Sequence, residues 1–284
     1  MPVATSQFVN AELHFLSPTL KEKPYTTSTS GDTNVVVEDH DVLITDLRSL
    51  SESELAGFKT DTSGFQWVKD QSGLKGDDFF DEEKIKNEYY PEIDSFLKKT
   101  LGARRTFIFD HTVRRGPEPG EKVEFGRDPS RRGPVTRAHV DQSPKAGAER
   151  VLLHLGEDAE RLSKGRAQIV NVWRPIRGPV QDYPLTVADY RSINSETDLQ
   201  PTDLIYPNRR GETLSVRFGG HQKWYYISDQ QPDDVLLLKC YESEVKEGRA
   251  LLTPHSAFQN PNAIGKDVLP RQSIEVRVLV FYTE

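Results

Sequence analysis

Short runs of alternating apolar and polar residues dominate the chain after residue 104. Alternation with a period of two is typical of strands that bury one face. The runs cover residues 105–113, 135–142, 166–174, 213–218, 223–228, 234–241, 249–257 and 273–283. Turn-forming residues separate them, and many short strands divided by turns predict a sandwich or jelly roll.

Helical spacing indicates that helices flank this mainly β fold. Apolar residues recur at that spacing between about residues 81 and 101, as Ile85, Tyr89, Ile93 and Phe96 or Leu97. Pro91 should kink this helix or split it. A second helical stretch is expected from residue 144 to about 163. Ser51 followed by Glu54 has the form of a capping box, which predicts a short helix there.

The first third of the chain has a weaker pattern. Residues 1–31 are interpreted as a poorly patterned arm, and residues 34–48 as strand, turn and strand. We expect residues 1–103 to form an arm with a flanking helical and strand layer, and residues 104–284 to form the core. With 284 residues and 35% hydrophobic content, both parts are expected to belong to one structural domain.

Charge and cysteine content narrow the class of protein. The net charge of −7 argues against general binding to nucleic acid or to an anionic membrane surface. No apolar run is long enough to cross a bilayer. The opening residues lack a basic start followed by an apolar run, so we expect no secretory signal. The single Cys240 fits a reducing compartment, and we expect a cytoplasmic protein, either a monomer or a homo-oligomer.

The strongest chemical signal is His139-Val140-Asp141. Side chains two apart on a strand point to the same face, so His139 and Asp141 should project together. His255 lies on a later strand-like run and supplies a third candidate ligand. Two histidines and one carboxylate leave three adjacent positions open on an octahedral metal, as in non-haem Fe(II) oxygenases. The co-substrate 2-oxoglutarate would occupy two of these positions and O2 the third.

The second signal is the run from Pro270 to Arg277. A co-substrate with a distal carboxylate needs a fixed cation, and the fork of an arginine suits it. Arg271 and Ser273 are the predicted pair, with Arg277 as a second candidate on the same face. Positions 271, 273, 275 and 277 are polar, whereas 274, 276, 278 and 280 are Ile or Val. One face of this strand should therefore be core and the other should line a polar site.

These blocks together resemble a known family. The resemblance covers roughly residues 105–284 and lies in blocks that follow one another in the expected order. They are Phe109–Arg114, His139–Asp141, Asn171–Pro175, Trp224–Tyr226, His255–Phe258 and Pro270–Arg277. The family is that of fungal and bacterial hydroxylase/desaturase proteins of secondary metabolism, related to the cephamycin-pathway hydroxylase and to fungal gibberellin desaturases.

The resemblance implies a double-stranded β-helix core with Fe(II), and 2-oxoglutarate and O2 as co-substrates. Family members hydroxylate, desaturate or close rings on varied small molecules, with succinate and CO2 as co-products. A small-molecule natural-product intermediate is therefore the expected substrate.

Several further residues are candidates for the substrate pocket. His111 precedes the H-x-D motif and is also a rival metal ligand. Asn171 and Arg174 lie on one strand-like run and point to opposite faces, so either could line the pocket or pack in the core. Trp224 and Tyr225 are candidates because small-molecule pockets often have aromatic walls, although both are more often core residues.

The segment before the H-x-D motif is rich in arginine. Residues 114–137 carry six Arg and Lys122 against four acidic residues, a net charge of +3 in a chain of net charge −7. The simpler interpretation is a solvated loop. The sharper hypothesis is a loop, containing Arg131 and Arg132, that closes over a substrate bearing a carboxylate.

Two other classes of protein remain as alternatives. A cupin-like metal hydrolase could use the same three ligands to activate water, but it has no obvious use for Arg271 and Ser273. A non-catalytic jelly roll that binds a small molecule would make the ligand triad incidental.

Overall fold

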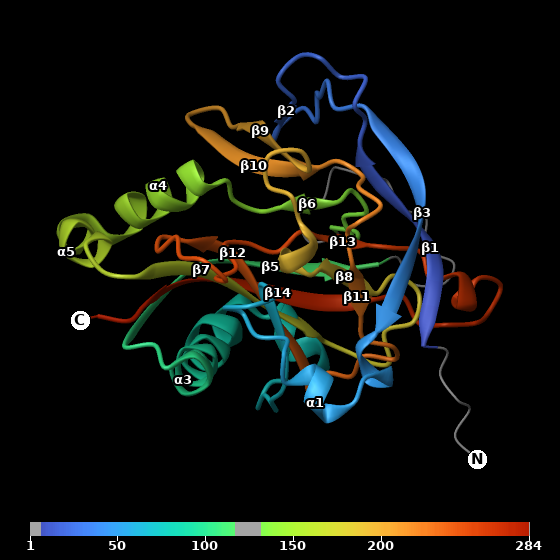
Figure 1. Ribbon diagram of the computed structural model, residues 1–284. Coiled ribbons are helices and arrows are strands. Elements are labelled where there is room, and N and C mark those ends of the chain that lie inside the picture. Colours follow the sequence, from blue (N-terminus) through green and yellow to red (C-terminus); the bar gives the residue numbers. More distant parts are fainter. Residues whose placement is uncertain (1–6, 117–131, 284) are drawn as a thin grey trace.

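Two β-sheets face each other in the computed structural model, which describes residues 7–116 and 132–283. The larger sheet has nine strands in the order β1-β3-β11-β8-β13-β6-β10-β9-β2, and the smaller has five in the order β4-β12-β7-β14-β5 (Figure 1). All described neighbours pair antiparallel except β3 with β11 and β2 with β9. The strand order, in which neighbours in space are mostly distant in sequence, is that of the double-stranded β-helix expected from the sequence.

The larger sheet combines long and short strands. Its members are β1 (Phe8–Leu16), β2 (Tyr25–Thr27), β3 (Val37–Asp46), β6 (His139–Val140), β8 (Leu185–Ala188), β9 (Leu199–Ile205), β10 (Arg210–Val216), β11 (Trp224–Tyr226) and β13 (His255–Ala257). β1 and β3 come from the first third of the chain and extend this sheet beyond β11. The N-terminal segment thus shares a sheet with the later strands.

The smaller sheet has a deeply buried centre, formed by β12, β7 and β14. Its members are β4 (Phe65–Lys69), β5 (Arg105–Arg115), β7 (Ala167–Pro175), β12 (Asp234–Glu242) and β14 (Gln272–Phe281). β14 lies between β7 and β5, and its even-numbered residues from Ile274 to Val280 pack in a hydrophobic cluster on the outer face. Its odd-numbered residues Ser273, Glu275 and Arg277 face inward, toward the larger sheet. The alternation predicted for this strand is confirmed.

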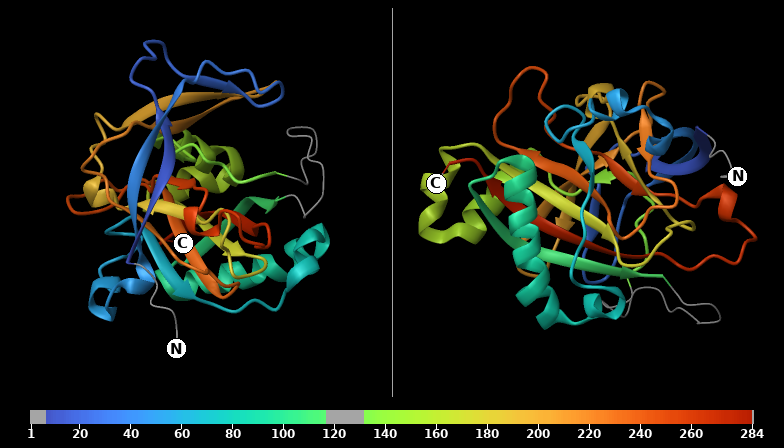
Figure 2. Two further views of the ribbon diagram at one scale, coloured as in Figure 1. Left: turned by 90° about the vertical axis from the view of Figure 1, so that its right-hand side faces the viewer. Right: turned by 90° about the horizontal axis from the view of Figure 1, so that it is seen from below.

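Helices cover the outer face of the smaller sheet and one end of the sandwich. They are α1 (Glu52–Leu55), α2 (Glu82–Lys84), α3 (Tyr90–Leu101), α4 (Pro144–Leu155) and α5 (Ala159–Ser163). In the view from below, α3 lies across the five-stranded sheet (Figure 2). Ile93 and Leu97 of this helix pack on Val172 and Val276 because their helical spacing gives α3 one apolar face.

The helix predictions are confirmed in outline. Ser51 and Glu54 form the predicted capping box. A π-helical segment, Ile85–Tyr89, lies directly before Pro91, which occupies the first turn of α3. Residues 82–101 form one uninterrupted helical run, so Pro91 is accommodated behind a π-helical segment and does not end the helix. None of the helices in the described part of the chain is long and apolar enough to span a membrane.

Some strand predictions are wrong. Phe8–Leu16 lies in the segment interpreted as an unpatterned arm, and Val37–Asp46 is one continuous strand without the expected turn. These two strands pair along their whole length, and β1 buries every second residue from Val9 to Phe15, an alternation that the interpretation as an arm overlooked. The strands predicted at 135–142 and 249–257 are shorter in the structure, where they correspond to β6 and β13. The division of the chain at residue 103 stays a prediction.

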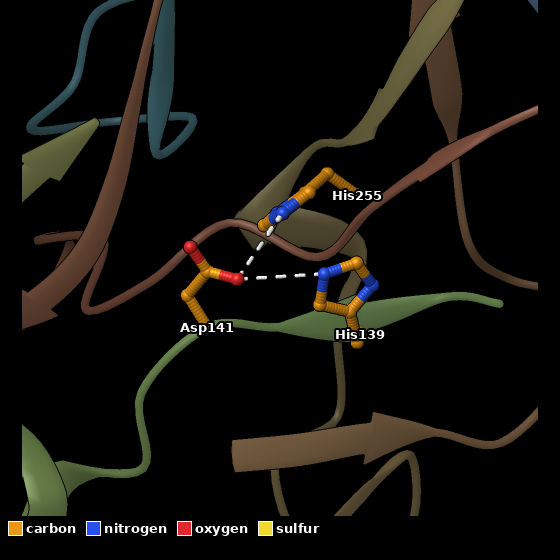
Figure 3. Close-up of side chains that lie close together, drawn as sticks. All are labelled: His139, Asp141 and His255. Atoms are coloured by element: carbon orange, nitrogen blue, oxygen red, sulfur yellow. Dashed lines mark ion pairs between the residues drawn. The ribbon is translucent and has the colours of Figure 1, made fainter. Parts of the chain in front are cut away.

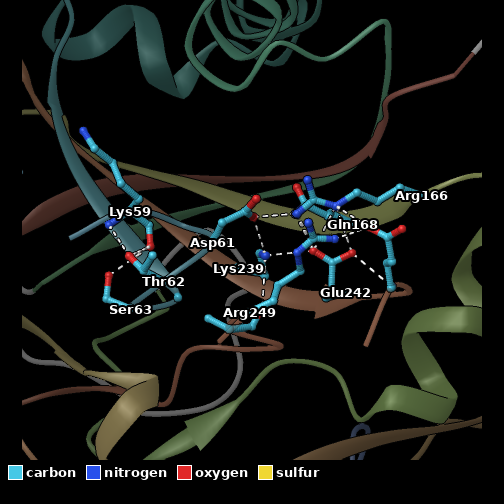
Figure 4. A network of polar contacts seen from close by, with 12 residues as sticks. Lys59, Asp61, Thr62, Ser63, Arg166, Gln168, Lys239, Glu242 and Arg249 are labelled. Atoms are coloured by element: carbon cyan, nitrogen blue, oxygen red, sulfur yellow. Dashed lines mark hydrogen bonds and ion pairs between the residues drawn. The ribbon is translucent and has the colours of Figure 1, made fainter. Parts of the chain in front are cut away.

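A buried group of charges ties the smaller sheet to the segment before β4 (Figure 4). The Lys239 side chain is fully buried and donates to Asp61, Glu242 and the carbonyl of Ala250 at 2.7, 2.8 and 3.0 Å. Arg166 donates to the same two carboxylates. Burial alone would raise the pKa of Asp61, but hydrogen bonds from Arg166 and Lys239 lower it to about 2. Each buried charge is therefore matched by an opposite one.

Replacing Lys239 should destabilise the protein, because Lys239 donates to both carboxylates of this network. Lys239→Met leaves the buried Glu242 and the partly exposed Asp61 with Arg166 as their shared cation, and we expect the free energy of unfolding to fall by about 3 kcal/mol. Chemical denaturation of both proteins measures this change. The control is Lys164→Met, since Lys164 is 72% exposed and its pairing with Glu160 should contribute less than about 1 kcal/mol. Equal stability of Lys239→Met and wild type would contradict the importance of the network.

Candidate active site

The three predicted ligands come together between the sheets (Figure 3). β6 ends with the H-x-D motif, so His139 lies on the strand and Asp141 directly after it. β13 begins at His255, which pairs directly with His139. Residues directly opposite each other on neighbouring strands present their side chains to the same face. The pairing of β6 with β13 is therefore what brings residues from distant parts of the sequence to one point.

The geometry of the cluster fits a metal ion. Asp141 Oδ1 lies 3.4 Å from His139 Nε2 and 3.9 Å from His255 Nε2, and the two imidazole rings are 4.4 Å apart. Each Nδ1 meets a backbone carbonyl, that of Arg137 at 2.7 Å and that of Thr253 at 3.0 Å. A carbonyl can only accept, so Nδ1 carries the proton and the Nε2 lone pair is left for a metal.

The second oxygen of Asp141 is already engaged. Asn171 Nδ2 donates to Oδ2 at 2.8 Å and Arg277 Nε donates to it at 3.0 Å. Both donors are held in turn by Glu275, whose two oxygens accept from Asn171 and Arg277 at 3.0 and 2.8 Å. Only Oδ1 is thus directed toward the histidines.

Charge also prepares these groups to bind a cation. Burial would raise the pKa of Asp141, but the charge of Arg277 and the contact with His139 hold it well below its ordinary value. Burial, and then His139, lower the pKa of His255. An ionised carboxylate and a neutral imidazole are the forms that bind a metal, so Asp141 and His255 need not lose protons at neutral pH.

A buried cation lies beside the cluster on the inner face of the smaller sheet. Arg271 is 3% exposed, donates from Nη1 to the carbonyl of Tyr183 at 2.7 Å, and stacks over Trp173. Arg271 Nε and Ser273 Oγ have no hydrogen-bond partner among the described residues. Burial and the nearby Arg114 lower the pKa of Arg271 to about 9, which leaves it charged at neutral pH. Two buried donors without acceptors fit the carboxylate of a small ligand.

Arg277, six residues after Arg271, differs from it in having acidic hydrogen-bond partners within the protein. Its guanidinium contacts Asp141, Glu275, Thr112 and Asp110. Burial would lower its pKa, but the carboxylates of Glu275 and Asp141 raise it. Arg277 is therefore fully engaged within the protein.

Two of the candidate substrate residues face away from the cluster. His111 Nδ1 meets the hydroxyl of Tyr90 at 2.7 Å, on the side of the sheet covered by α3. Arg174 is buried on that outer face and donates to Tyr89 and to Asp70. Because both are held by neighbours on the far side of the smaller sheet, neither is carried into the site described below.

The aromatic pair on β11 is divided by the alternation of the strand. Tyr225 pairs with Val187, which pairs with His255, so Tyr225 faces inward in the same row as the ligands. Trp224 faces outward and packs against Phe15 in a separate hydrophobic cluster. Of the two, only Tyr225 borders the interior.

A cavity of about 550 Å³ opens beside Asp141 and Arg277. Its walls come from β5, from α4, and from β9 and β10 with the turn between them. The segment 117–131, which includes Arg131, lies outside the described residues, whereas Arg132 and Arg114 line the cavity. The Arg-rich loop therefore cannot be followed through its length.

Glu275 and Tyr183 are residues that sequence reasoning missed. Glu275 stood out only as a polar position on β14, and its role as the acceptor for Asn171 and Arg277 depends on the register of three strands. Tyr183 contributes a backbone carbonyl, for which no side-chain signal exists in a sequence.

A family model matches residues 13–281, and its description is "Oxidoreductase/YMDC permease-like domain". Among curated proteins, the hydroxylase/desaturase efuI of Hormonema carpetanum is 35% identical over 274 residues, which cover 90% of this chain and 88% of the relative. The Fe(II)/2-oxoglutarate-dependent dioxygenase nvfI of Aspergillus novofumigatus is 33% identical and is covered over 99% of its length.

Solved structures agree with these relatives. The iron and alpha-ketoglutarate-dependent endoperoxidase NvfI superposes with a TM-score of 0.82 at 29% sequence identity, over 98% of this chain and 99% of that one. Both the sequence and the fold match across nearly the whole length. The chain therefore belongs to the family of fungal hydroxylase/desaturase proteins and is an oxygenase of secondary metabolism that uses Fe(II), 2-oxoglutarate and O2 on a small-molecule substrate.

Proposed function

We propose that His139, Asp141 and His255 bind the Fe(II) of this oxygenase, and that Arg271 and Ser273 bind the distal carboxylate of 2-oxoglutarate. The observation that carries the proposal is the convergence of two Nε2 atoms and one Oδ1 atom within 4.8 Å of one another. Two imidazoles and one carboxylate are the donor set that leaves three adjacent metal positions open.

The metal and its co-substrates supply the oxidising power when bound, converting 2-oxoglutarate to succinate and CO2 while an unactivated C–H bond of the substrate is oxidised. The chain's own residues orient and enclose the reactants. Asn171 and Arg277 hold Asp141 Oδ2, which presents Oδ1 as a single ligand atom. Arg277 thus acts as a positioning residue in this proposal, and the co-substrate is left to Arg271.

The unpartnered donors of Arg271 and Ser273 support the second part of the proposal. Burying a guanidinium without full hydrogen bonding is costly, and a bound carboxylate removes that cost. A cupin-like hydrolase would have no ligand for this pair. The outcome of oxidation in this chain is hydroxylation or desaturation, the two reactions in the names of its hydroxylase/desaturase relatives, or ring closure.

The substrate is proposed to be a natural-product intermediate, because the relatives carry names from such pathways. Incubating the protein with Fe(II), 2-oxoglutarate, and a panel of amino acids, peptides and terpenoids tests this, with mass spectrometry of the products. Succinate formed in step with an oxidised panel member supports the proposal. Oxidation without 2-oxoglutarate consumption would refute it.

We also propose a cytoplasmic location. The chain has one cysteine, and burial raises the pKa of the Cys240 thiol well above its ordinary value, so the thiol stays protonated. A protein without a disulfide has no need of an oxidising compartment. Recovery of the native protein in the cytosolic fraction supports this location, and recovery inside secretory vesicles contradicts it.

Removing any proposed ligand should abolish turnover while the fold survives. His139→Ala, Asp141→Ala and His255→Ala each remove a metal bond but little apolar burial. We expect circular dichroism close to wild type, together with loss of iron and of succinate production. Asp141→Asn is the sharpest variant because it keeps the shape and removes the charge. A variant with wild-type iron content and turnover would remove its residue from the triad.

Arg271→Gln should raise the 2-oxoglutarate concentration that gives half-maximal rate by at least about 30-fold, since a buried charge-assisted pair is worth roughly 2–5 kcal/mol. Arg277→Gln should change that concentration little and should weaken metal binding instead, because Arg277 contacts Asp141. Titrations of 2-oxoglutarate and of Mn(II) on both variants separate the two effects. The reverse result would assign the co-substrate to Arg277.

Asn171→Ala should weaken metal binding without unfolding the protein. The residue holds the carboxylate that we propose as a ligand, and loss of such a supporting partner typically costs about 10- to 100-fold in metal affinity. Isothermal titration with Mn(II) under inert gas measures the change. Asn87→Ala, at an exposed position on the helical segment before α3, is the matched control. Unchanged Mn(II) affinity in Asn171→Ala would show that the hydrogen bond to Asp141 has no such role.

A further inference from the structure

Two arginines from different elements converge on one wall of the 550 Å³ cavity. Arg150 lies on α4, and Arg209 lies in the turn between β9 and β10. α4 is fixed against β12 because Gly147 makes room for Tyr241, whose Cδ2 would lie 2.3 Å from a Cβ at that position. The position of Arg150 is thus set by the packing of the scaffold.

Neither guanidinium forms an ion pair with an acidic side chain among the residues that the structure describes. Arg150 lies 5.4 Å from the ring centre of Phe109, and Arg209 lies 3.8 Å from that of Tyr206. Burial, and then the like charge of Arg209, lower the pKa of Arg150. Aromatic rings thus hold two neighbouring positive charges that repel each other.

The acidic groups around the cavity are mostly engaged elsewhere. Glu212 accepts from Lys23, and Asp110 and Asp141 contact Arg277. Glu149 also lines the cavity but is exposed on the surface of α4. The arginine pair therefore keeps an excess of positive charge on its wall.

The same cavity has an apolar side. Leu152 and Leu153 of α4 line it and are 61% and 60% exposed, and Leu204 joins them from β9. Neighbouring leucines exposed to this extent are unfavourable in water unless a ligand covers them. A cavity with leucines on one side and unpaired arginines on the other fits an amphipathic anion.

We propose that this cavity binds the organic substrate as a carboxylate, with the acid group between Arg150 and Arg209 and the apolar body against Leu152, Leu153 and Leu204. This rests on the proposed function, which places the metal beside Asp141 at the inner end of the cavity. Arg277 stands between the metal ligands and Asp110, and Asp110 is a charged neighbour of Arg150. The acid group is thus held away from the reacting carbon, on the far side of Arg277.

The carboxylate could also be that of 2-oxoglutarate, so the test separates the two sources. The probe is 4-(1-pyrenyl)butyrate, an apolar ring system with one carboxylate, and its methyl ester is the neutral match. Fluorescence anisotropy measures both on protein loaded with Mn(II) and saturating 2-oxoglutarate. Wild type should bind the acid more tightly than the ester. The double variant Arg150→Gln/Arg209→Gln should bind the acid roughly 10- to 100-fold more weakly and the ester equally well.

Arg161→Gln is the control, because Arg161 is an exposed residue on α5 paired with Asp158, and it should change neither probe. Equal binding of acid and ester by wild type, or equal losses of both in the double variant, would overturn the proposal. So would competition between the acid and 2-oxoglutarate. Calorimetry of 2-oxoglutarate on the same proteins checks the proposed function separately. It should show a loss in Arg271→Gln and none in the double variant.

Discussion

The carboxylate of Asp141 must be both buried and ionised, and the arrangement of the interior follows from that requirement. Its two oxygens are used differently: Oδ2 accepts from Asn171 and Arg277, while Oδ1 faces the imidazoles. Glu275 in turn holds both donors. A carboxylate without these donors would take up a proton in a dry interior and lose its value as a metal ligand. β7 and β14 therefore have to pair in one register, and β6 has to face them from the other sheet.

Two arginines in contrasting states lie close together in sequence, Arg271 directly before β14 and Arg277 within it. The charge of Arg277 is paired with carboxylates of the protein itself. Arg271 has carbonyl and aromatic neighbours, and its own Nε and the nearby Ser273 Oγ have no acceptor among the described residues, so its charge is available to a ligand. The strand can hold both because alternation sends its apolar residues to the opposite face, where α3 packs. Arg277 thus supports the interior of the protein, whereas Arg271, further along the same inner face, is left to contact a ligand.

The sequence was most informative where a pattern repeats or a motif is complete. The alternation of β14, the helical spacing from Ile85 to Leu97, and the grouping of His139, Asp141 and His255 all appear in the structure as expected. Which face of a buried strand looks inward could not be predicted, because both faces of β7 are apolar or satisfied, and this placed Arg174 among the pocket candidates. β8 was missed because its place depends on pairing with β11 and β13, which are distant in sequence. β1 was missed although Val9, Ala11, Leu13 and Phe15 alternate with polar or exposed residues.

Gly64 joins the charged network to the candidate metal ligand His255. Its carbonyl accepts from the backbone of Lys239 and from Thr253 Oγ1, and the carbonyl of Thr253 accepts from His255 Nδ1. A Cβ at Gly64 would lie 2.5 Å from the carbonyl oxygen of Leu252, and its φ of +88° favours glycine. β4, which follows Gly64, is an edge strand, and edges open before sheet centres. Local fraying at this edge therefore reaches the imidazole, so metal retention during heating depends on the border of the sheet as well as on its centre.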